Sequence, residues 1–425
     1  MRCVATFQST NWPAYRRSEA NVNPASVDPT AVLAGRLPNH SLPREAYLDP
    51  AMFEADLARV WTKEWILAGV EAAIPEVGMF ERVRVGQFDL LLVRAGDGAV
   101  LALHNVCRHR GFVLCDQPDG LIRNRIVCPY HQWAYHLDGT VARARSMPAD
   151  FDATNYALGR AHCQTVGGMI FVCLAEVPPD FIPFRELVEP YLEPYDLSSA
   201  IVAKRTVGIE RGNWKLVMEN NRECFHCRVS HPELCATFPE APLHAGNASS
   251  DEAAQMNAMV DSWERSGLPS RFSAASDAAF RVMRMPLHDS AQSMTLDGEP
   301  AVSRRFASLP EGNVGDVLLY HYPSTWMHLQ ADHCLVFRIT PVAPALTELV
   351  TYWLVPPGSE AGIHYDMSNL TQVWDATNAQ DTALVERAHA GILSPAYRPG
   401  PYSPSEETGV IQFIDWYVHR MSTAR

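Results

Sequence analysis

The residues best suited to chemistry lie in two short stretches with closely spaced cysteines and histidines. In the first stretch, a single residue separates Cys107 from His109, and Cys128 and His131 follow after a gap of eighteen residues. Two thiolates and two imidazoles on two tight loops can hold one [2Fe–2S] unit, with the cysteines on one iron and the histidines on the other. The spacing therefore predicts an iron–sulfur cluster of mixed ligation, which is the Rieske type.

Structural zinc is the alternative, because zinc sites also combine two cysteines with two histidines. Zinc motifs usually place two or more residues between paired ligands, whereas a single residue separates Cys107 from His109. The short spacing favours the cluster. Cys115 lies inside the motif but outside its spacing, so we expect it to be a packing residue.

A second group of candidate ligands lies in NWKLVMENNRECFHCRVSHPEL, which contains Glu223, His226 and His231. On a helix, Glu223 and His226 would share one face. His231 precedes Pro232, which disfavours helical geometry, so we expect it to reach in from the helix end. Two histidines and one carboxylate with open positions form the facial triad of non-haem Fe(II) oxygenases. The pattern predicts that His226 and His231 bind a mononuclear iron.

The third iron ligand is expected from a helical segment between residues 367 and 392. Asp381 falls about 20° from Trp374, in the middle of the apolar stripe of that helix, whereas Asp375 lies about 100° away and should face solvent. A carboxylate on an apolar face is costly unless it is paired or binds a metal. We therefore predict Asp381 as the ligand, with a buried aspartate satisfied by hydrogen bonds as the alternative.

Cys224 and Cys227 form a CxxC motif among these predicted ligands. In another setting this motif would suggest redox chemistry or zinc. Because it interleaves with iron ligands on one expected helix, a structural role is favoured.

The elements that must position these residues divide the chain of 425 residues into three parts. Residues 1–45 are rich in Ser, Asn and Pro and predict a mobile tail. Residues 46–176 combine a helix from Met52 to Trp65 with short strands separated by turn dipeptides, which predicts a small all-β domain. Residues 177–425 follow a Pro-rich segment and mix strands with helices around 212–226 and 367–392, which predicts an α+β domain on an antiparallel sheet.

Composition narrows the function classes. A formal net charge of -13 argues against a nucleic-acid partner and mildly favours a cationic ligand. No apolar run is long enough to span a membrane, so a cytoplasmic location is expected. Ten cysteines in 425 residues are too sparse and irregular for a disulfide framework.

From residue 45 onward the chain resembles the α subunits of Rieske oxygenases. CRHRG and CPYHQW are generic to that superfamily. The second half is most similar to its quaternary-ammonium branch, which acts on glycine betaine, proline betaine (stachydrine) and carnitine. The resembling stretches are ENNRECFHC, SHPEL, RMPLHDSAQSMTLDG, VWDATNAQD, AYRPGPYS and FIDWY.

The resemblance implies a Rieske domain followed by a helix-grip catalytic domain, in a homotrimer in which each cluster serves the mononuclear iron of its neighbour. Glu223 would be the carboxylate that bridges His131 of one subunit to His226 of the next. Ring-hydroxylating dioxygenases usually have Asp at that position, so Glu223 matches the quaternary-ammonium branch. Phe225 stands where Tyr is commoner, and a changed pocket could follow from it.

The implied activity is O₂-dependent N-demethylation of a small betaine, glycine betaine or proline betaine, with release of formaldehyde. A reductase partner would supply NAD(P)H-derived electrons to the cluster and then to the Fe(II). A trimethylammonium group has no proton to donate, so aromatic faces and carboxylates should recognise it. The aromatic candidates are Trp326, Tyr322, Trp374, Tyr397, Tyr402 and Trp416.

Two other functions stay open at this point. An aromatic ring-hydroxylating dioxygenase acting on an aromatic acid would want a cationic anchor in its pocket, whereas the net charge and Glu223 point the other way. A non-catalytic Rieske electron carrier would need the cluster alone, and would leave Asp381 and the paired histidines unexplained.

Overall fold

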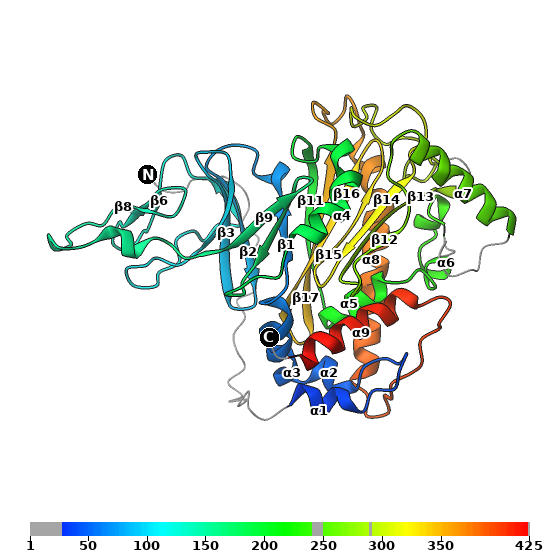
Figure 1. Cartoon of the computed structure of the whole chain (residues 1–425), viewed down its shortest axis with the longest axis horizontal. Coiled ribbons are helices and arrows are strands. Elements are labelled where there is room, and N and C mark those ends of the chain that lie inside the picture. The colour runs from blue at the N-terminus through cyan, green and yellow to red at the C-terminus, as the bar shows by residue number, and fades with distance from the viewer. Residues whose placement is uncertain (1–27, 240–249, 289–290, 424–425) are drawn as a thin grey trace.

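The first half of the chain folds around an antiparallel sheet of short strands (Figure 1). The computed structural model describes residues 28–239, 250–288 and 291–423. The strand order is β1-β10-β9-β4-β3-β2-β5. The bounds are β1 Ile66–Val70, β2 Met79–Val85, β3 Phe88–Arg94, β4 Val100–His104, β5 Asp119–Leu121, β9 Arg160–Val166 and β10 Met169–Cys173. Gly168, in the turn between β9 and β10, has a φ of 80°, and a Cβ there would lie 2.6 Å from the backbone of Leu197. Glycine is therefore required where this sheet meets the second half.

A smaller sheet of three strands lies at one end of the molecule, far from the helices of the second half (Figure 1). It consists of β6 Ile126–Val127, β7 Ala134–Tyr135 and β8 Val141–Arg143. The loop between β6 and β7 carries Cys128 and His131, and the loop after β4 carries Cys107 and His109. The four residues thus occupy two loops, as their spacing predicted.

The second half is built on a seven-stranded antiparallel sheet with the order β11-β17-β16-β15-β14-β13-β12. The bounds are β11 Ile201–Glu210, β12 Ser273–Ala274, β13 Phe280–Met285, β14 Asp316–His321, β15 Thr325–Leu329, β16 Cys334–Ala343 and β17 Leu346–Val355. Alternate residues of β16 pack on opposite faces, because successive side chains of a strand point to opposite sides. Phe337 packs against Trp374 of α8 (Met367–Ile392) and shares one core cluster with Leu335, whereas Val336 belongs to the other core cluster, which contains Phe184 of α4 (Ile182–Leu192). The predicted α+β architecture, with a helix laid across an antiparallel sheet, is confirmed.

The remaining helices surround this sheet (Figure 1). They are α1 Pro29–Ala34, α2 Arg44–Leu48, α3 Pro50–Asp56, α5 Trp214–Asn221, α6 Cys227–Ser230, α7 Ser250–Arg265 and α9 Thr408–Ser422. Among the described residues, no helix is both long enough and apolar enough to cross a membrane.

The prediction of a mobile tail through residue 45 is wrong for residues 28–45. This segment contains α1 and the start of α2, and Leu33 and Leu42 are buried in one core with Phe413 and Tyr417 of α9. The prediction rested on the average composition of the segment, which is polar. Two leucines that bury apolar surface are enough to fix the segment to the core, and an average does not show them. Residues 1–27 of the expected tail lie outside the described residues. The boundary expected near residue 176 stays a prediction.

The helix expected from Met52 to Trp65 begins earlier than predicted. It also packs against the second half of the chain, although it was assigned to the all-β part that follows it in sequence. It runs as α3 and continues through a π-helical turn at Leu57–Trp61. Both pieces belong to the core of the second half, not to that of the all-β part. A prediction that groups elements by sequence proximity could not have seen this.

A fully buried ion pair joins α3 to the second half. Lys215 of α5 donates to Asp56, whose carboxylate also accepts hydrogen bonds from Trp214 Nε1 at 2.9 Å and Tyr417 OH at 2.7 Å. Both charged side chains are completely inaccessible to solvent. Burial lowers the pKa of Lys215, and the adjacent Asp56 carboxylate opposes that effect. Each charge therefore depends on the other.

We predict that Asp56→Ala destabilises the protein by about 3–5 kcal/mol, because Lys215 is left as an uncompensated buried charge. Asp375→Ala is the matched control, since Asp375 pairs with Lys204 at 2.6 Å but keeps 42% of its side chain exposed. Its cost should stay below about 1 kcal/mol. Midpoints of urea unfolding measure both. Equal shifts for the two variants would contradict the role given to the buried pair.

Candidate metal centres

The two cysteines of the first centre are buried side by side. Cys107 and Cys128 are each at most 2% exposed, and the Tyr135 hydroxyl lies 3.3 Å from Cys107 Sγ. Burial raises the pKa of the Cys128 thiol, while the backbone N–H groups of Tyr130 and His131 bond to its sulfur and partly offset the effect. Such N–H donors stabilise a thiolate, the form that binds iron.

The two histidines of this centre lie together on the other side of the loops. The His109 and His131 rings are 4.7 Å apart between centroids, and His109 stacks on the buried Trp133 at 5.0 Å. His131 Nδ1 is buried and has no hydrogen-bond partner within residues 28–239, 250–288 and 291–423. An orphaned ring nitrogen is costly unless something binds it. Adjacent sulfurs and paired imidazoles with a free nitrogen fit a [2Fe–2S] cluster.

The second centre follows α5 in a turn, not in a continuous helix. Asn213 caps the start of α5, which ends at Asn221, two residues before Glu223. The expectation that Glu223 and His226 share a helix is therefore wrong. The Glu223 carboxylate accepts hydrogen bonds from the N–H groups of Phe225 and His226, and such local bonds compete with the helical ladder. His231 caps the end of α6, as its position before Pro232 predicted.

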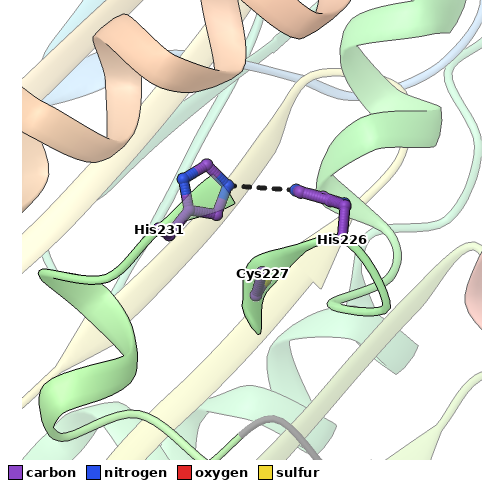
Figure 2. A group of neighbouring side chains, drawn as sticks. All are labelled: His226, Cys227 and His231. Atoms are coloured by element: carbon purple, nitrogen blue, oxygen red, sulfur yellow. Dashed lines mark hydrogen bonds between the residues drawn. The ribbon is translucent and has the colours of Figure 1, made fainter. Parts of the chain in front are cut away.

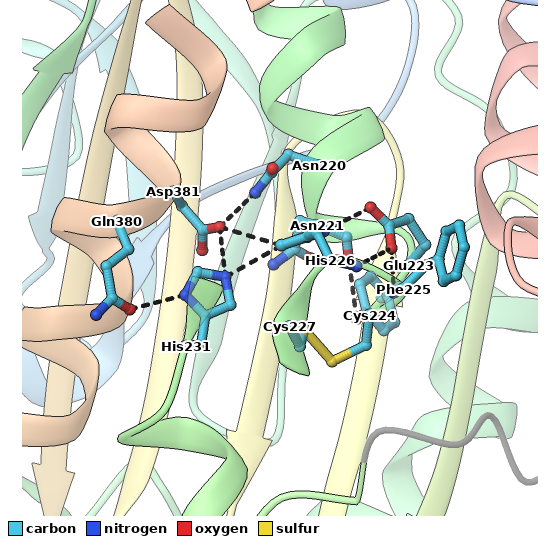
Figure 3. The surroundings of a disulfide bond; sticks show 11 residues. Asn220, Asn221, Glu223, Cys224, Phe225, His226, Cys227, His231, Gln380 and Asp381 are labelled. Atoms are coloured by element: carbon cyan, nitrogen blue, oxygen red, sulfur yellow. Dashed lines mark hydrogen bonds and ion pairs between the residues drawn. A yellow bond between two sulfur atoms is a disulfide. The ribbon is translucent and has the colours of Figure 1, made fainter. Parts of the chain in front are cut away.

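Three side chains nevertheless converge on one point. The Nε2 atoms of His226 and His231 are 3.1 Å apart (Figure 2). Asp381 reaches the same point from the middle of α8, with Oδ1 3.0 Å from His231 Nε2 and 3.4 Å from His226 Nε2 (Figure 3). Asp375 lies on another face, beside Lys204. The helical phase inferred from the sequence is confirmed.

The outer nitrogen of each histidine is held by a partner. His226 Nδ1 lies 2.5 Å from Glu223 Oε1, and His231 Nδ1 lies 2.8 Å from Gln380 Oε1. Partners of this kind orient an imidazole and leave Nε2 for a metal. Burial alone would lower the pKa of His226, but hydrogen bonds to Asp381 and Glu223 raise it to about 9. The point between the histidines thus favours positive charge, and two imidazoles with one carboxylate suit Fe(II).

The cysteines of the CxxC motif form a disulfide beside this point (Figure 3). The Cys227 sulfur lies within 4.8 Å of ligand atoms of His226 and His231. Because it is bonded to Cys224, it is no thiolate, and Asp381 is left as the third donor. The disulfide ties together the turn that carries Glu223 and His226, in line with the structural role that the sequence favoured.

A cavity of about 130 Å³ opens at the three converging side chains. It is smaller than a typical pocket for a drug-sized ligand, which is roughly 300–1,000 Å³. Its apolar and aromatic lining comprises Phe225, Leu234, Phe238, Pro239, Met283, Met285, Leu318, Tyr320 and Trp374. Such walls suit a small, weakly hydrated group.

Only Trp374 of the six aromatic candidates lines this cavity. Trp326 stacks on Phe337 beneath it, and Tyr402 donates a hydrogen bond to Glu219. Sequence reasoning missed Phe238 and Tyr320, for which residue type was the only signal. It also missed two polar residues, Gln380 and Asn220, whose Nδ2 donates to Asp381 Oδ1 at 2.6 Å. Gln380 directly precedes Asp381, and Asn220 lies in the stretch ENNRECFHC. Their position beside predicted ligands was the signal that could have identified them.

Comparisons with known proteins show the family to which the chain belongs. Residues 64–158 match the family model described as Rieske [2Fe-2S] domain, and residues 197–423 match that of the ring hydroxylating alpha subunit (catalytic domain). The chain belongs to the Rieske oxygenase α-subunit family. The Rieske and catalytic parts expected from the sequence are thereby confirmed, together with the enzyme class and its two iron cofactors.

The names of several relatives refer to quaternary ammonium substrates. The glycine betaine monooxygenase oxygenase subunit of Pseudomonas aeruginosa (strain UCBPP-PA14) is 42% identical over 94% of this chain and 93% of its own length. The carnitine monooxygenase oxygenase subunit of Escherichia coli (strain K12) is 30% identical over 50% of this chain and 58% of its own.

Solved structures share the fold. The quaternary ammonium Rieske monooxygenase CntA matches with a TM-score of 0.71 and 19% identity, over 92% of this chain and 98% of that chain. A naphthalene 1,2-dioxygenase from Rhodococcus sp. matches with a TM-score of 0.62 and 16% identity, over 89% and 94%. At these identities the likeness concerns the fold alone.

We predict that Asp381→Ala lowers the affinity for mononuclear Fe(II) at least about tenfold and leaves the cluster intact, because a donor of the second centre alone is lost. Iron per chain, measured against the visible absorbance of the cluster, tests this. Asp375→Ala, on the same helix, should change neither quantity. The opposite pattern would show that Asp381 is not a ligand.

Proposed function

We propose that this chain is the oxygenase component of a Rieske monooxygenase that N-demethylates a small betaine, with glycine betaine as first choice and proline betaine as second. The observation that carries the proposal is a small aromatic-walled cavity placed directly on the converging His226, His231 and Asp381. The identity of 42% to a glycine betaine monooxygenase subunit supports the same substrate class.

The site residues have the following proposed roles. Cys107, His109, Cys128 and His131 would hold the [2Fe–2S] cluster, and His226, His231 and Asp381 would hold Fe(II). An iron bound there supplies the activation of O₂, with electrons from NAD(P)H through a reductase partner. The protein's own part is to hold the donors in place, to keep the imidazole tautomers fixed through Glu223 and Gln380, and to limit water beside the substrate.

The cavity supports recognition of a cationic methylammonium group. The Trp374 ring lines the cavity and offers an aromatic face to such a group. A desolvated cation over an aromatic face gains about 2 kcal/mol. With a methyl group held at the metal-binding point, hydroxylation of that carbon gives a hydroxymethylamine, which separates into formaldehyde and a dimethylamino product.

The arrangement of the chain also supports a homotrimer in which each cluster serves its neighbour. The cluster-bearing loops near β6 lie at one end of the molecule, and α6 lies at the other (Figure 1). Phe225 and Val229 beside the second centre are 63% and 88% exposed. A neighbour's cluster loops would cover them, with Glu223 carrying the contact from His131 of that neighbour to His226. We place the complex in the cytoplasm, where NAD(P)H is supplied.

One observation is also compatible with the rival function, hydroxylation of an aromatic acid. That substrate requires a cationic anchor, and Arg222 and Arg281 line the same cavity. A betaine also carries a carboxylate, however, so the arginines do not separate the two. The small volume and the relatives support the betaine. A simple electron carrier would need no such cavity.

With NADH, a surrogate reductase and O₂, the protein should release formaldehyde from glycine betaine in step with substrate loss. The isostere 3,3-dimethylbutanoate carries a tert-butyl group in place of the trimethylammonium and should bind about thirtyfold more weakly, because the cation–π gain of about 2 kcal/mol is absent. Equal binding would refute cation recognition. Diols from benzoate-like acids, without formaldehyde from any betaine, would establish the aromatic alternative.

Glu223→Gln should retain both metal centres and lose most turnover, by about a hundredfold or more, since the charged link between His226 and a neighbour's His131 is removed. Iron content, the cluster's paramagnetic signal after reduction and formaldehyde release measure these separately. Glu233→Gln is the control, because Glu233 accepts a hydrogen bond from Gln380 and lies outside the link between His226 and a neighbour's His131. Largely retained activity in Glu223→Gln would place the electron route elsewhere.

A further inference from the structure

Two arginines share the cavity of the second centre without a carboxylate partner. Arg222 lies in the turn after α5, and Arg281 lies on β13. Neither forms an ion pair with any carboxylate of the described residues. In a chain with 48 acidic and 35 basic residues, two adjacent cations that pair with no acid in the described part of the chain call for an explanation.

Arg222 is almost completely buried, at 3% exposure. Its Nε donates to the Tyr322 hydroxyl at 2.6 Å, and its guanidinium lies 4.2 Å from the centre of the Tyr320 ring. Both terminal nitrogens are buried and find no hydrogen-bond partner among the residues that the structure describes. Burying a guanidinium with unmatched N–H groups is costly unless an anion completes the site.

Arg281 lies over the same Tyr320 ring, at 5.0 Å, and has one long hydrogen bond, of 3.3 Å, to Gln412. Burial and the neighbouring Arg222 lower its pKa to about 10. Two like charges held this close repel each other, and an anion between them would relieve the repulsion. The planar fork of a guanidinium matches a carboxylate in particular.

We propose that Arg222 and Arg281 form an anion subsite that binds the carboxylate of the substrate. The proposal rests on the proposed function and sharpens it, because the cavity then has an aromatic end and a positively charged end. The cationic nitrogen lies towards Trp374, and the carboxylate lies towards the arginines. Such a cavity selects small zwitterions and discriminates against choline, whose hydroxyl leaves both guanidinium groups unmatched.

The test compares glycine betaine with choline in the cluster- and iron-loaded enzyme, using formaldehyde release. Arg281→Gln and Arg222→Gln should each raise KM for glycine betaine by about tenfold to a hundredfold, as expected for a lost charge-assisted hydrogen bond. The preference for betaine over choline should fall by the same factor, and Arg281→Lys should restore part of it. Arg271→Gln is the matched control, because Arg271 is exposed and pairs with Asp261 at 2.6 Å.

A second measurement separates this proposal from the proposed function. Binding of 3,3-dimethylbutanoate, which has the carboxylate but no positive charge, is followed by calorimetry in the wild type and in Arg281→Gln. Weaker binding to the variant supports the subsite even if no betaine is demethylated. Unchanged binding, or a wild type that uses choline as well as glycine betaine, overturns it. Cluster absorbance reports on folding, and Arg281→Gln decides if Arg222→Gln does not fold.

Discussion

The constraint on which the structure depends is that the three predicted metal ligands must meet at one point although they come from different elements. His226 and His231 flank the short α6, whereas Asp381 lies in the middle of α8. Neither element could fix the other by itself. The seven-stranded sheet provides the common floor, because Trp374 of α8 packs on the same face of β16 as Trp214 and Leu216 of α5. The position of α8 against this face thus sets the distance between carboxylate and imidazoles.

The regular elements around the site were predictable from the sequence, but the turns were not. The apolar periodicity of α8 located Asp381 because a long helix has a fixed phase. The stretch from Glu223 to His226 shows the limit. The spacing of Glu223 and His226 is compatible with a helix. In the structure, however, Glu223 accepts hydrogen bonds from the backbone of Phe225 and His226, and α5 has already ended at Asn221. Side-chain-to-backbone bonds of this kind depend on local geometry that residue spacing does not encode.

The cavity lining shows a second limit. Trp374 could be placed because it shares a helix face with Asp381, whereas Phe238 and Tyr320 reach the cavity through the folding of distant segments. Arg222 lay within a stretch already compared with known relatives, but its unmatched nitrogens became visible only once its surroundings were known. A protein with a negative net charge can therefore have a positive local potential in one cavity, and the net charge of the sequence does not predict it.

The packing of α1–α3 has a consequence for how the two parts of the molecule relate. These helices precede the cluster-bearing sheet in sequence, yet they complete the core of the second half through Leu33, Phe53 and Asp56. The sheet that carries the cluster loops is thus an insertion into the catalytic core, and not a module joined to its front. A fragment starting after that sheet would lack part of its own interior. Exchange of the cluster-bearing part between relatives would accordingly need two junctions, one on each side of the insertion.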